Sequence, residues 1–191
     1  MLMSKQLIKY DIGEVEGDGE CLFNAVAYGI IFLTTDFRPT RTEYKPLAKK
    51  LRALVVKEQK RIVNSNNMDY IVSLAGNYNN SSNSSSSLKN KAHKYIKKMS
   101  KKKTWGGQAE VLLLGEIVKS YGFKGIKVYD DSNKKEIKEM RTKNLKSNSN
   151  VIHLVLENVS MGGLHFNFWN KSASSSNSNS KKTSPSVKIR R

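Results

Sequence analysis

The apolar pattern changes character along this chain, and that change limits the folds it can adopt. Four segments before residue 125 repeat apolar residues at helical spacing: 21–30, 43–63, 88–99 and 107–122. Three later segments alternate or form short apolar runs, as strands do: 125–130, 151–157 and 164–169. Helices first and strands last predict a segregated α+β domain. We expect a small central β-sheet packed between helical regions, against the helices that contain Cys21 and Val111.

Composition sets the size of the folded part. The chain has 191 residues, enough for one domain of about 100–200 residues. Two stretches, NYNNSSNSSSS at 77–87 and SASSSNSNS at 172–180, contain almost nothing to bury, which predicts mobility. We therefore expect a folded domain over residues 1–170, with a variable basic helical region at 43–99 that includes the loop 77–87. A disordered basic tail is expected at 171–191.

Two further features exclude whole classes of protein. No apolar run approaches the roughly 18–20 residues that cross a bilayer, and the first residues lack a secretory signal pattern. The single cysteine, Cys21, cannot form an intrachain disulfide or a cysteine-based zinc site. We expect a monomer without a membrane span that acts in the cytoplasm, or in the cytosol of a host cell if the chain comes from a pathogen.

Charge is segregated along the chain. Residues 1–40 carry three basic and six acidic side chains, whereas residues 41–104 carry sixteen basic and three acidic ones. The basic block and the tail favour binding of a polyanion, either nucleic acid or acidic lipid. The chain has no zinc finger, no RNP-like segment and no basic-region heptad to specify such binding. A solvated lysine-rich surface is the alternative interpretation.

Cys21 stands where the first helix is expected to begin. Free N–H groups and roughly half a positive charge at a helix N-terminus favour a thiolate. The preceding Gly17, Asp18, Gly19 and Glu20 include two glycines that let the backbone turn its amides inward, as a developing oxyanion requires. The pattern indicates a nucleophile, and a small buried apolar side chain is the alternative.

A thiolate mechanism needs a base, and the chain offers three histidines. His93 lies among lysines on an expected solvated helix face, and a structural role fits His153 within its strand. His165 opens a strand and shares one face with Asn167, about 6.5–7 Å away along the backbone. The Asn167 carboxamide could orient the imidazole, so that His165 takes the proton of Cys21.

Three short motifs resemble those of the ovarian-tumour (OTU) family of cysteine proteases. DGECLFNA at 18–25 is similar to the family's nucleophile motif, D-G-x-C-L-F followed by a small residue. WGGQAE at 105–110 resembles W-G-G-x-x-E, and HFN at 165–167 resembles the family's late histidine element. The motifs occur in the family's order over roughly residues 10–170, although 36–104 matches only as a variable helical region. The resemblance implies a papain-like OTU fold.

For activity, the resemblance implies hydrolysis of the isopeptide or peptide bond after the C-terminal glycine of ubiquitin or a ubiquitin-like modifier. Cys21 would be the nucleophile that forms an acyl-enzyme thioester, His165 the general base and Asn167 its orienter. In the family, the residue matching Asp18 supports the loop of the oxyanion hole, here residues 18–21, or serves as a third catalytic residue. Both roles stay open for Asp18.

The resemblance also implies a substrate channel. Trp105 would border the channel for the Gly-Gly tail of the modifier, with Gly106 and Gly107 allowing close approach of the backbone. The alternative is a core tryptophan followed by a helix-entry turn. Glu20 and the acidic side chains before it would attract the basic tail of ubiquitin. The family needs no metal or organic cofactor, and a third possibility is an OTU-like fold that binds a modifier without cleaving it.

Overall fold

A computed structural model describes residues 12–76, 85–145, 150–159 and 163–170. Its helices are α1 (Cys21–Thr35), α2 (Arg41–Asn64), α3 (Met68–Gly76), α4 (Ser85–Met99), α5 (Gln108–Ile117) and the short 3-10 helix η2 (Val118–Tyr121). Its strands are β1 (Ile12–Gly13), β2 (Gly125–Asp130), β3 (Glu136–Arg141), β4 (Val151–Val159) and β5 (Gly163–Trp169). The predicted α+β class, with helices before strands, is confirmed.

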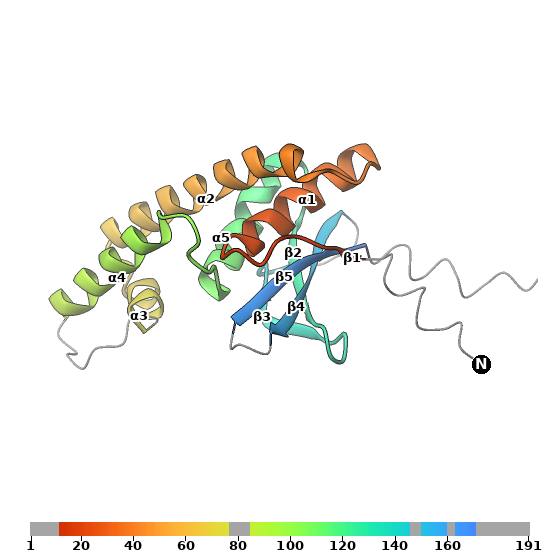
Figure 1. Ribbon diagram of the computed structural model, residues 1–191. Helices are drawn as coiled ribbons and strands as arrows, with labels where there is room; N and C mark the ends of the chain where they lie inside the picture. The colour runs from red at the N-terminus through yellow and green to blue at the C-terminus, as the bar shows by residue number, and fades with distance from the viewer. Residues whose placement is uncertain (1–11, 77–84, 146–149, 160–162, 171–191) are drawn as a thin grey trace, which may run out of the picture.

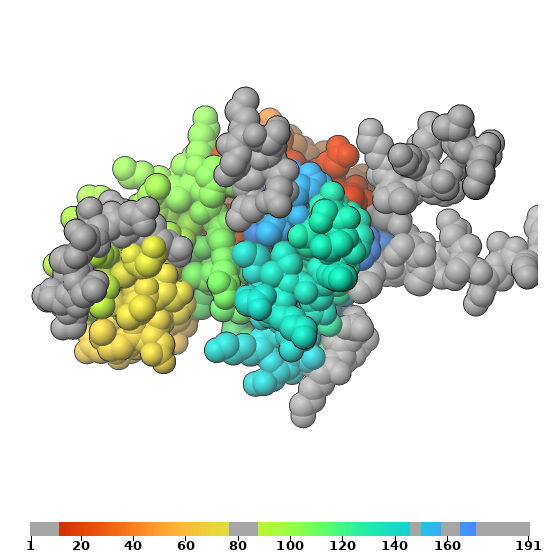
Figure 2. Space-filling view, turned by 90° about the horizontal axis from the view of Figure 1, so that it is seen from below, coloured from red at the N-terminus to blue at the C-terminus, as the bar shows by residue number. Residues whose placement is uncertain are grey.

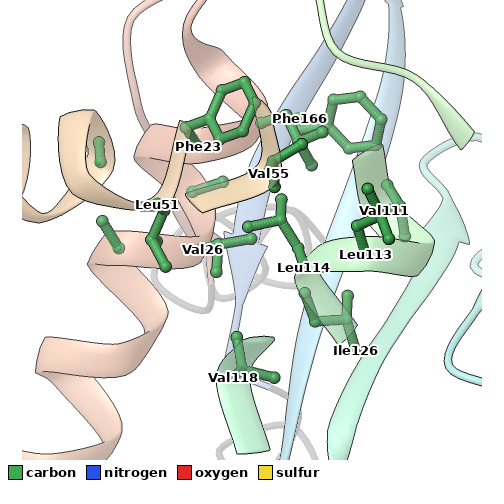
Figure 3. Close-up of a cluster of buried hydrophobic side chains, with 14 of the residues drawn as sticks. Phe23, Val26, Leu51, Val55, Val111, Leu113, Leu114, Val118, Ile126 and Phe166 are labelled. Carbon is green, nitrogen blue, oxygen red and sulfur yellow. The ribbon is translucent and has the colours of Figure 1, made fainter. Parts of the chain in front are cut away.

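Within the described residues, five strands form one mixed sheet in the order β1-β5-β4-β2-β3. β2 and β4 are parallel, and the other neighbouring pairs are antiparallel. The sheet register places Ile126, Ile152 and Phe166 on one face, and α1 and α5 pack there, as Figure 3 shows for part of this cluster. The sheet therefore packs on the helices that contain Cys21 and Val111, as predicted.

The N-terminal part of α1 is the most buried part of that helix, because every residue from Cys21 to Ile30 is buried. A Cβ atom on Gly29 would lie 2.7 Å from the Phe168 ring, so glycine at this position allows α1 to approach β5 closely. Phe23 of α1 and Phe166 of β5 lie at the same end of the apolar cluster (Figure 3). This packing holds the first turn of α1 against β5.

Helix α2 connects two parts of the molecule. It begins with a capping box, in which the Glu43 carboxylate accepts a hydrogen bond from the Thr40 N–H at 2.6 Å. It then runs alongside α1 and on to the α3 and α4 pair (Figure 1), with Leu51, Val55 and Val63 fully buried. Figure 2 shows α3 in yellow on one side of the molecule and the strands in cyan and blue on the other, with green residues between them.

Several element boundaries differ from the sequence prediction. α3 is short and lies in an Asn-rich stretch, β1 has only two residues, and β3 (EIKEMR) lacks an apolar run because it is a partly exposed edge strand. In the segment 107–122, predicted as one helix, the α-helix ends at Ile117 and a 3-10 helix follows. α4 begins at Ser85, inside the predicted loop 77–87. The rest of that loop and the tail 171–191 lie outside the described residues.

A buried polar cluster joins α2, α4 and α5. The Glu110 carboxylate accepts hydrogen bonds from the Gln59 amide at 2.6 Å, the Tyr95 hydroxyl at 3.0 Å and the Gly107 N–H at 2.8 Å. Burial raises the pKa of Glu110, although these hydrogen bonds oppose the shift. The glutamate of the WGGQAE motif thus fixes the start of α5 to the other two helices.

We expect Glu110→Ala to lower the free energy of unfolding by about 3 kcal/mol, because it leaves three buried donors without their acceptor. Glu110→Gln should cost less, since its carbonyl oxygen still accepts from part of the cluster. Urea unfolding at neutral pH measures both, with Glu58→Ala on the exposed side of α2 as control. Stability of Glu110→Ala within 1 kcal/mol of wild type would contradict a structural role for this cluster.

Candidate active site

The site forms where β5 reaches the N-terminus of α1. A backbone hydrogen bond from Phe166 reaches the Cys21 sulfur and acts to lower the thiol pKa. The neighbouring His165 ring faces the loop before α1, since a Cβ atom on Gly17 would lie 3.5 Å from Nδ1 of His165. Segments from opposite ends of the chain therefore meet beside the thiol.

The thiol itself is not in the state expected of a helix N-terminus. Cys21 is only 1% exposed, and burial raises its pKa. Hydrogen bonds from the Phe166 and Leu22 backbone oppose this shift, while the negative charge of Asp18 adds to it. The expectation of a favoured thiolate is wrong for this structure, because desolvation outweighs the stabilisation that the end of α1 provides.

Asn167 does not orient His165 here. Its Oδ1 accepts a hydrogen bond from the Val15 N–H at 2.9 Å, and its Nδ2 donates to Oε1 of Glu157 at 2.8 Å. Nδ1 of His165 is buried and has no hydrogen-bond partner among the described residues. The predicted bond is absent, and the Asn167 side chain bonds instead to Val15, at the start of the loop that leads to Cys21, and to Glu157. Asn167 instead ties that loop to β5.

Asp18 organises the loop before α1. Its Oδ1 accepts from the Glu20 N–H at 3.0 Å and from the Asn24 amide at 3.5 Å, and Nζ of Lys45 lies 2.7 Å from Oδ2. Partial burial raises the pKa of Asp18, but the hydrogen bonds and charge of Lys45 and the Glu20 N–H lower it overall. The carboxylate is therefore ionised. Because the Glu20 N–H is already bonded, it is not an available donor for an oxyanion.

The acidic segment before Cys21 is paired with α2. Glu16 lies 2.5 Å from Arg41, and Lys45 lies 2.7 Å from Asp18 and 3.5 Å from Glu20. Three of the carboxylates expected to attract a basic substrate tail are thus already matched by cations of the same chain. The predicted steering role for Glu20 loses this support, because its charge is largely compensated inside the molecule.

The Trp105-Gly106-Gly107 segment lies directly beside the start of α1. A Cβ atom on Gly106 would lie 2.6 Å from the Leu22 side chain, so glycine is required for this close approach. Trp105 is 43% exposed and belongs to the surface, not to the core. A groove of about 630 Å³ runs along this segment, lined by Ser73, Tyr95, Lys98, Lys103 and residues 104–109. The segment therefore borders a surface groove on one side and packs against Leu22 of α1 through Gly106.

Residues 16–166 match a protein family described as OTU-like cysteine protease. The chain belongs to the OTU-like cysteine protease family. The matched range contains Asp18, Cys21, Trp105 and His165, while Asn167 lies one residue beyond it. A search of curated proteins yields no match.

Two solved OTU structures are similar to this OTU-family chain. An ovarian tumour (OTU) domain in complex with ubiquitin has a TM-score of 0.48 and 23% identity, covering 82% of this chain and 67% of that one. The viral OTU domain protease from Dera Ghazi Khan virus has a TM-score of 0.44 and 18% identity, covering 82% of this chain and 78% of that one.

Sequence analysis of this OTU-family protein missed the residues that support the site. Lys45 and Arg52 reach the loop before Cys21 from α2, and Glu157 lies opposite His165 in the sheet. The only sequence pattern that could reveal the first two is their spacing of two helical turns, which puts them on one face of α2. Glu157 has no sequence signature, because its position depends on the register between β4 and β5.

The basic block contributes a second groove, of about 460 Å³. Lys49 and Lys102 line it together with Lys45, Arg52 and Glu20. Lys45 and Arg52 already bond within the chain, so polyanion binding stays a prediction. Among the described residues, none of the helices is both long and apolar enough to span a bilayer, and no cluster of three or more His, Cys, Asp or Glu side chains could hold a metal ion.

The raised pKa of Cys21 predicts an unusual pH dependence for alkylation of the ligand-free protein. Because the rate follows the thiolate fraction, reaction with iodoacetamide should keep rising above pH of about 8.5, where an ordinary thiol levels off. The folded state holds this proton more tightly than the unfolded chain does, so its ionisation at higher pH also lowers the free energy of unfolding. A short cysteine peptide is the control. A plateau at neutral pH would contradict the effect of burial.

Proposed function

We propose that this chain is a thiol-dependent hydrolase that cleaves the isopeptide or peptide bond after the C-terminal glycine of ubiquitin or a ubiquitin-like modifier. The observation that carries the proposal is the meeting of β5 and α1, which brings His165 and Phe166 to the loop and helix that contain Cys21. Membership in a cysteine protease family supports the choice of nucleophile. The complex of a similar domain with ubiquitin supports the choice of substrate class.

In the proposed reaction the Cys21 sulfur attacks the carbonyl carbon of the terminal glycine while its proton passes to His165. The C–N bond then breaks, and the amine leaves with the proton that His165 returns. Water, deprotonated by His165, next attacks the thioester and releases the glycine carboxylate and the Cys21 thiol. Since burial keeps the resting thiol protonated, proton transfer has to accompany the attack.

The groove along Trp105, Gly106 and Gly107 fits the role of a channel for a thin peptide tail. Gly106 of this segment packs against the side chain of Leu22, the residue after the thiol, and the two glycines present backbone without side chains to the groove. A Gly-Gly tail has no side chains. It therefore fits a narrow groove, in which only its backbone can be bound. Extended substrates with bulky residues at these positions should be excluded.

Asn167 has a role in this proposal that differs from simple orientation. Its Oδ1 accepts from the Val15 N–H and so fixes the loop that leads to Cys21. To orient His165 as well, this oxygen would have to come within hydrogen-bond distance of the imidazole Nδ1–H in the substrate complex. Catalytic hydrogen bonds often form fully only in the substrate complex.

Ubiquitin with an electrophile at its C-terminus tests the proposal directly. We expect the wild-type protein to form a covalent adduct with the mass of one ubiquitin added at Cys21, and Cys21→Ala to form none while still binding ubiquitin. Intact-protein mass spectrometry and a pull-down measure these two results. Adduct formation by Cys21→Ala would contradict the mechanism. If the wild-type protein bound ubiquitin but neither reacted with the probe nor cleaved conjugates, the chain would be a non-catalytic binding domain.

The two residues of β5 should differ in their effect on turnover. His165→Ala should lower kcat by about 10²–10⁴-fold, because proton transfer is lost. Asn167→Ala should lower it by a smaller factor, roughly 10- to 100-fold, because only positioning of the loop and imidazole is lost. Steady-state hydrolysis of a fluorogenic ubiquitin amide measures both. Wild-type turnover in Asn167→Ala would assign the supporting role to Asp18 instead.

A further inference from the structure

The peptide between Gly19 and Glu20 is held at both of its ends. Its carbonyl oxygen, on Gly19, accepts a hydrogen bond from Nη2 of Arg52 at 3.1 Å. Its N–H, on Glu20, donates to Oδ1 of Asp18 at 3.0 Å, and Nζ of Lys45 lies 2.7 Å from the other oxygen of Asp18. Both ends of this peptide therefore lead to side chains of α2.

Arg52 serves as a buried hub between two loops. It is 6% exposed, and its guanidinium lies 4.3 Å from the centre of the Phe23 ring. Besides the Gly19 oxygen, it donates to the carbonyl oxygens of Met99, Lys101 and Thr104, at 3.0, 3.2 and 3.0 Å. These carbonyls belong to the segment that leads from α4 to Trp105. One side chain thus links the loop before Cys21 to the segment that borders the groove.

Direct contact between these two loops explains why the link is needed. Gly19 has φ +79°, a conformation that side chains disfavour, and a Cβ atom there would lie 2.4 Å from the Lys103 carbonyl oxygen. At this point Gly19 lies against the backbone of Lys103, so no side chain at position 19 can fix how the loops meet. The planar fork of Arg52 supplies the hydrogen bonds that do so.

We infer that Arg52 is a positioning residue for the oxyanion step, which it serves by holding the Gly19 carbonyl toward α2. If this peptide rotated, its oxygen could turn toward the site and repel the negative charge that develops on the substrate carbonyl. With the oxygen held by Arg52 and the N–H by Asp18, the backbone enters α1 at Cys21 in one orientation. This role rests on the proposed hydrolase function.

Arg52→Lys tests the role, because lysine keeps the positive charge but cannot donate to several separated carbonyls at once. We expect kcat for a fluorogenic ubiquitin amide to fall about 10- to 100-fold, with KM changed by less than about twofold, because the modifier still binds. Alkylation of Cys21 by iodoacetamide forms no oxyanion, so its rate should stay within about twofold of wild type. Arg61→Lys, an exposed change on the same helix, is the matched control.

The outcomes separate the alternatives. A wild-type kcat in folded Arg52→Lys overturns the inference. An equal loss of kcat and of alkylation rate also overturns it, because the substitution would then have disrupted the surroundings of the Cys21 thiol. If Arg52→Lys does not fold, Arg52→Gln, whose amide can still donate to one of the carbonyls, decides: a lower kcat with unchanged alkylation supports the inference, and an unchanged kcat overturns it. A wild-type protein that hydrolyses no ubiquitin substrate contradicts the proposed function itself, and this role with it.

Discussion

The pairing of α2 with the loop before α1 is the interaction on which the site depends. Arg41, Lys45 and Arg52 lie on one side of α2 and meet Glu16, Asp18 and the Gly19 carbonyl in turn. Lys45 and Arg52 are partly or fully withdrawn from water, so their bonds are less screened than surface pairs. The acidic loop before Cys21 and one side of α2 are therefore the two sides of one internal interface. The loop preceding the thiol is fixed to a helix and does not form an open acidic surface.

Burial and reactivity oppose each other at Cys21. The apolar packing that fixes α1 against β5 also removes the sulfur from water, and that desolvation keeps the thiol protonated in the absence of substrate. The proposed chemistry is consistent with this state, because a neighbouring imidazole can accept the proton as the sulfur attacks. Asn167 likewise serves the packing of the loop, since its Oδ1 accepts from the Val15 N–H and its Nδ2 donates to Glu157, whereas Nδ1 of His165 has no partner among the described residues.

Sequence reasoning succeeded where the relevant pattern is local. The stripes of α1 and α5 and the alternation in β5 each lie within one element, and the burial of Leu22, Val111 and Phe166 follows from them. It failed for α3 and β3, which are short or polar and are stabilised by packing on other elements, α4 in the case of α3 and β2 and α5 in the case of β3. It also misjudged the Cys21 pKa, because the position of a residue at a helix N-terminus is visible in the sequence whereas its exposure to water is not.

The sequence alone determined the α+β class, the family and the residues around which a thiol site could form, since periodicity and short motifs depend on neighbours along the chain. Tertiary structure decided how those residues are connected. Arg52 reaches four carbonyls in two loops, and Asn167 bonds to Val15 instead of His165. Such contacts depend on sheet register and on how helices pack, and these are set by the summed burial of many side chains, which no single segment of sequence encodes.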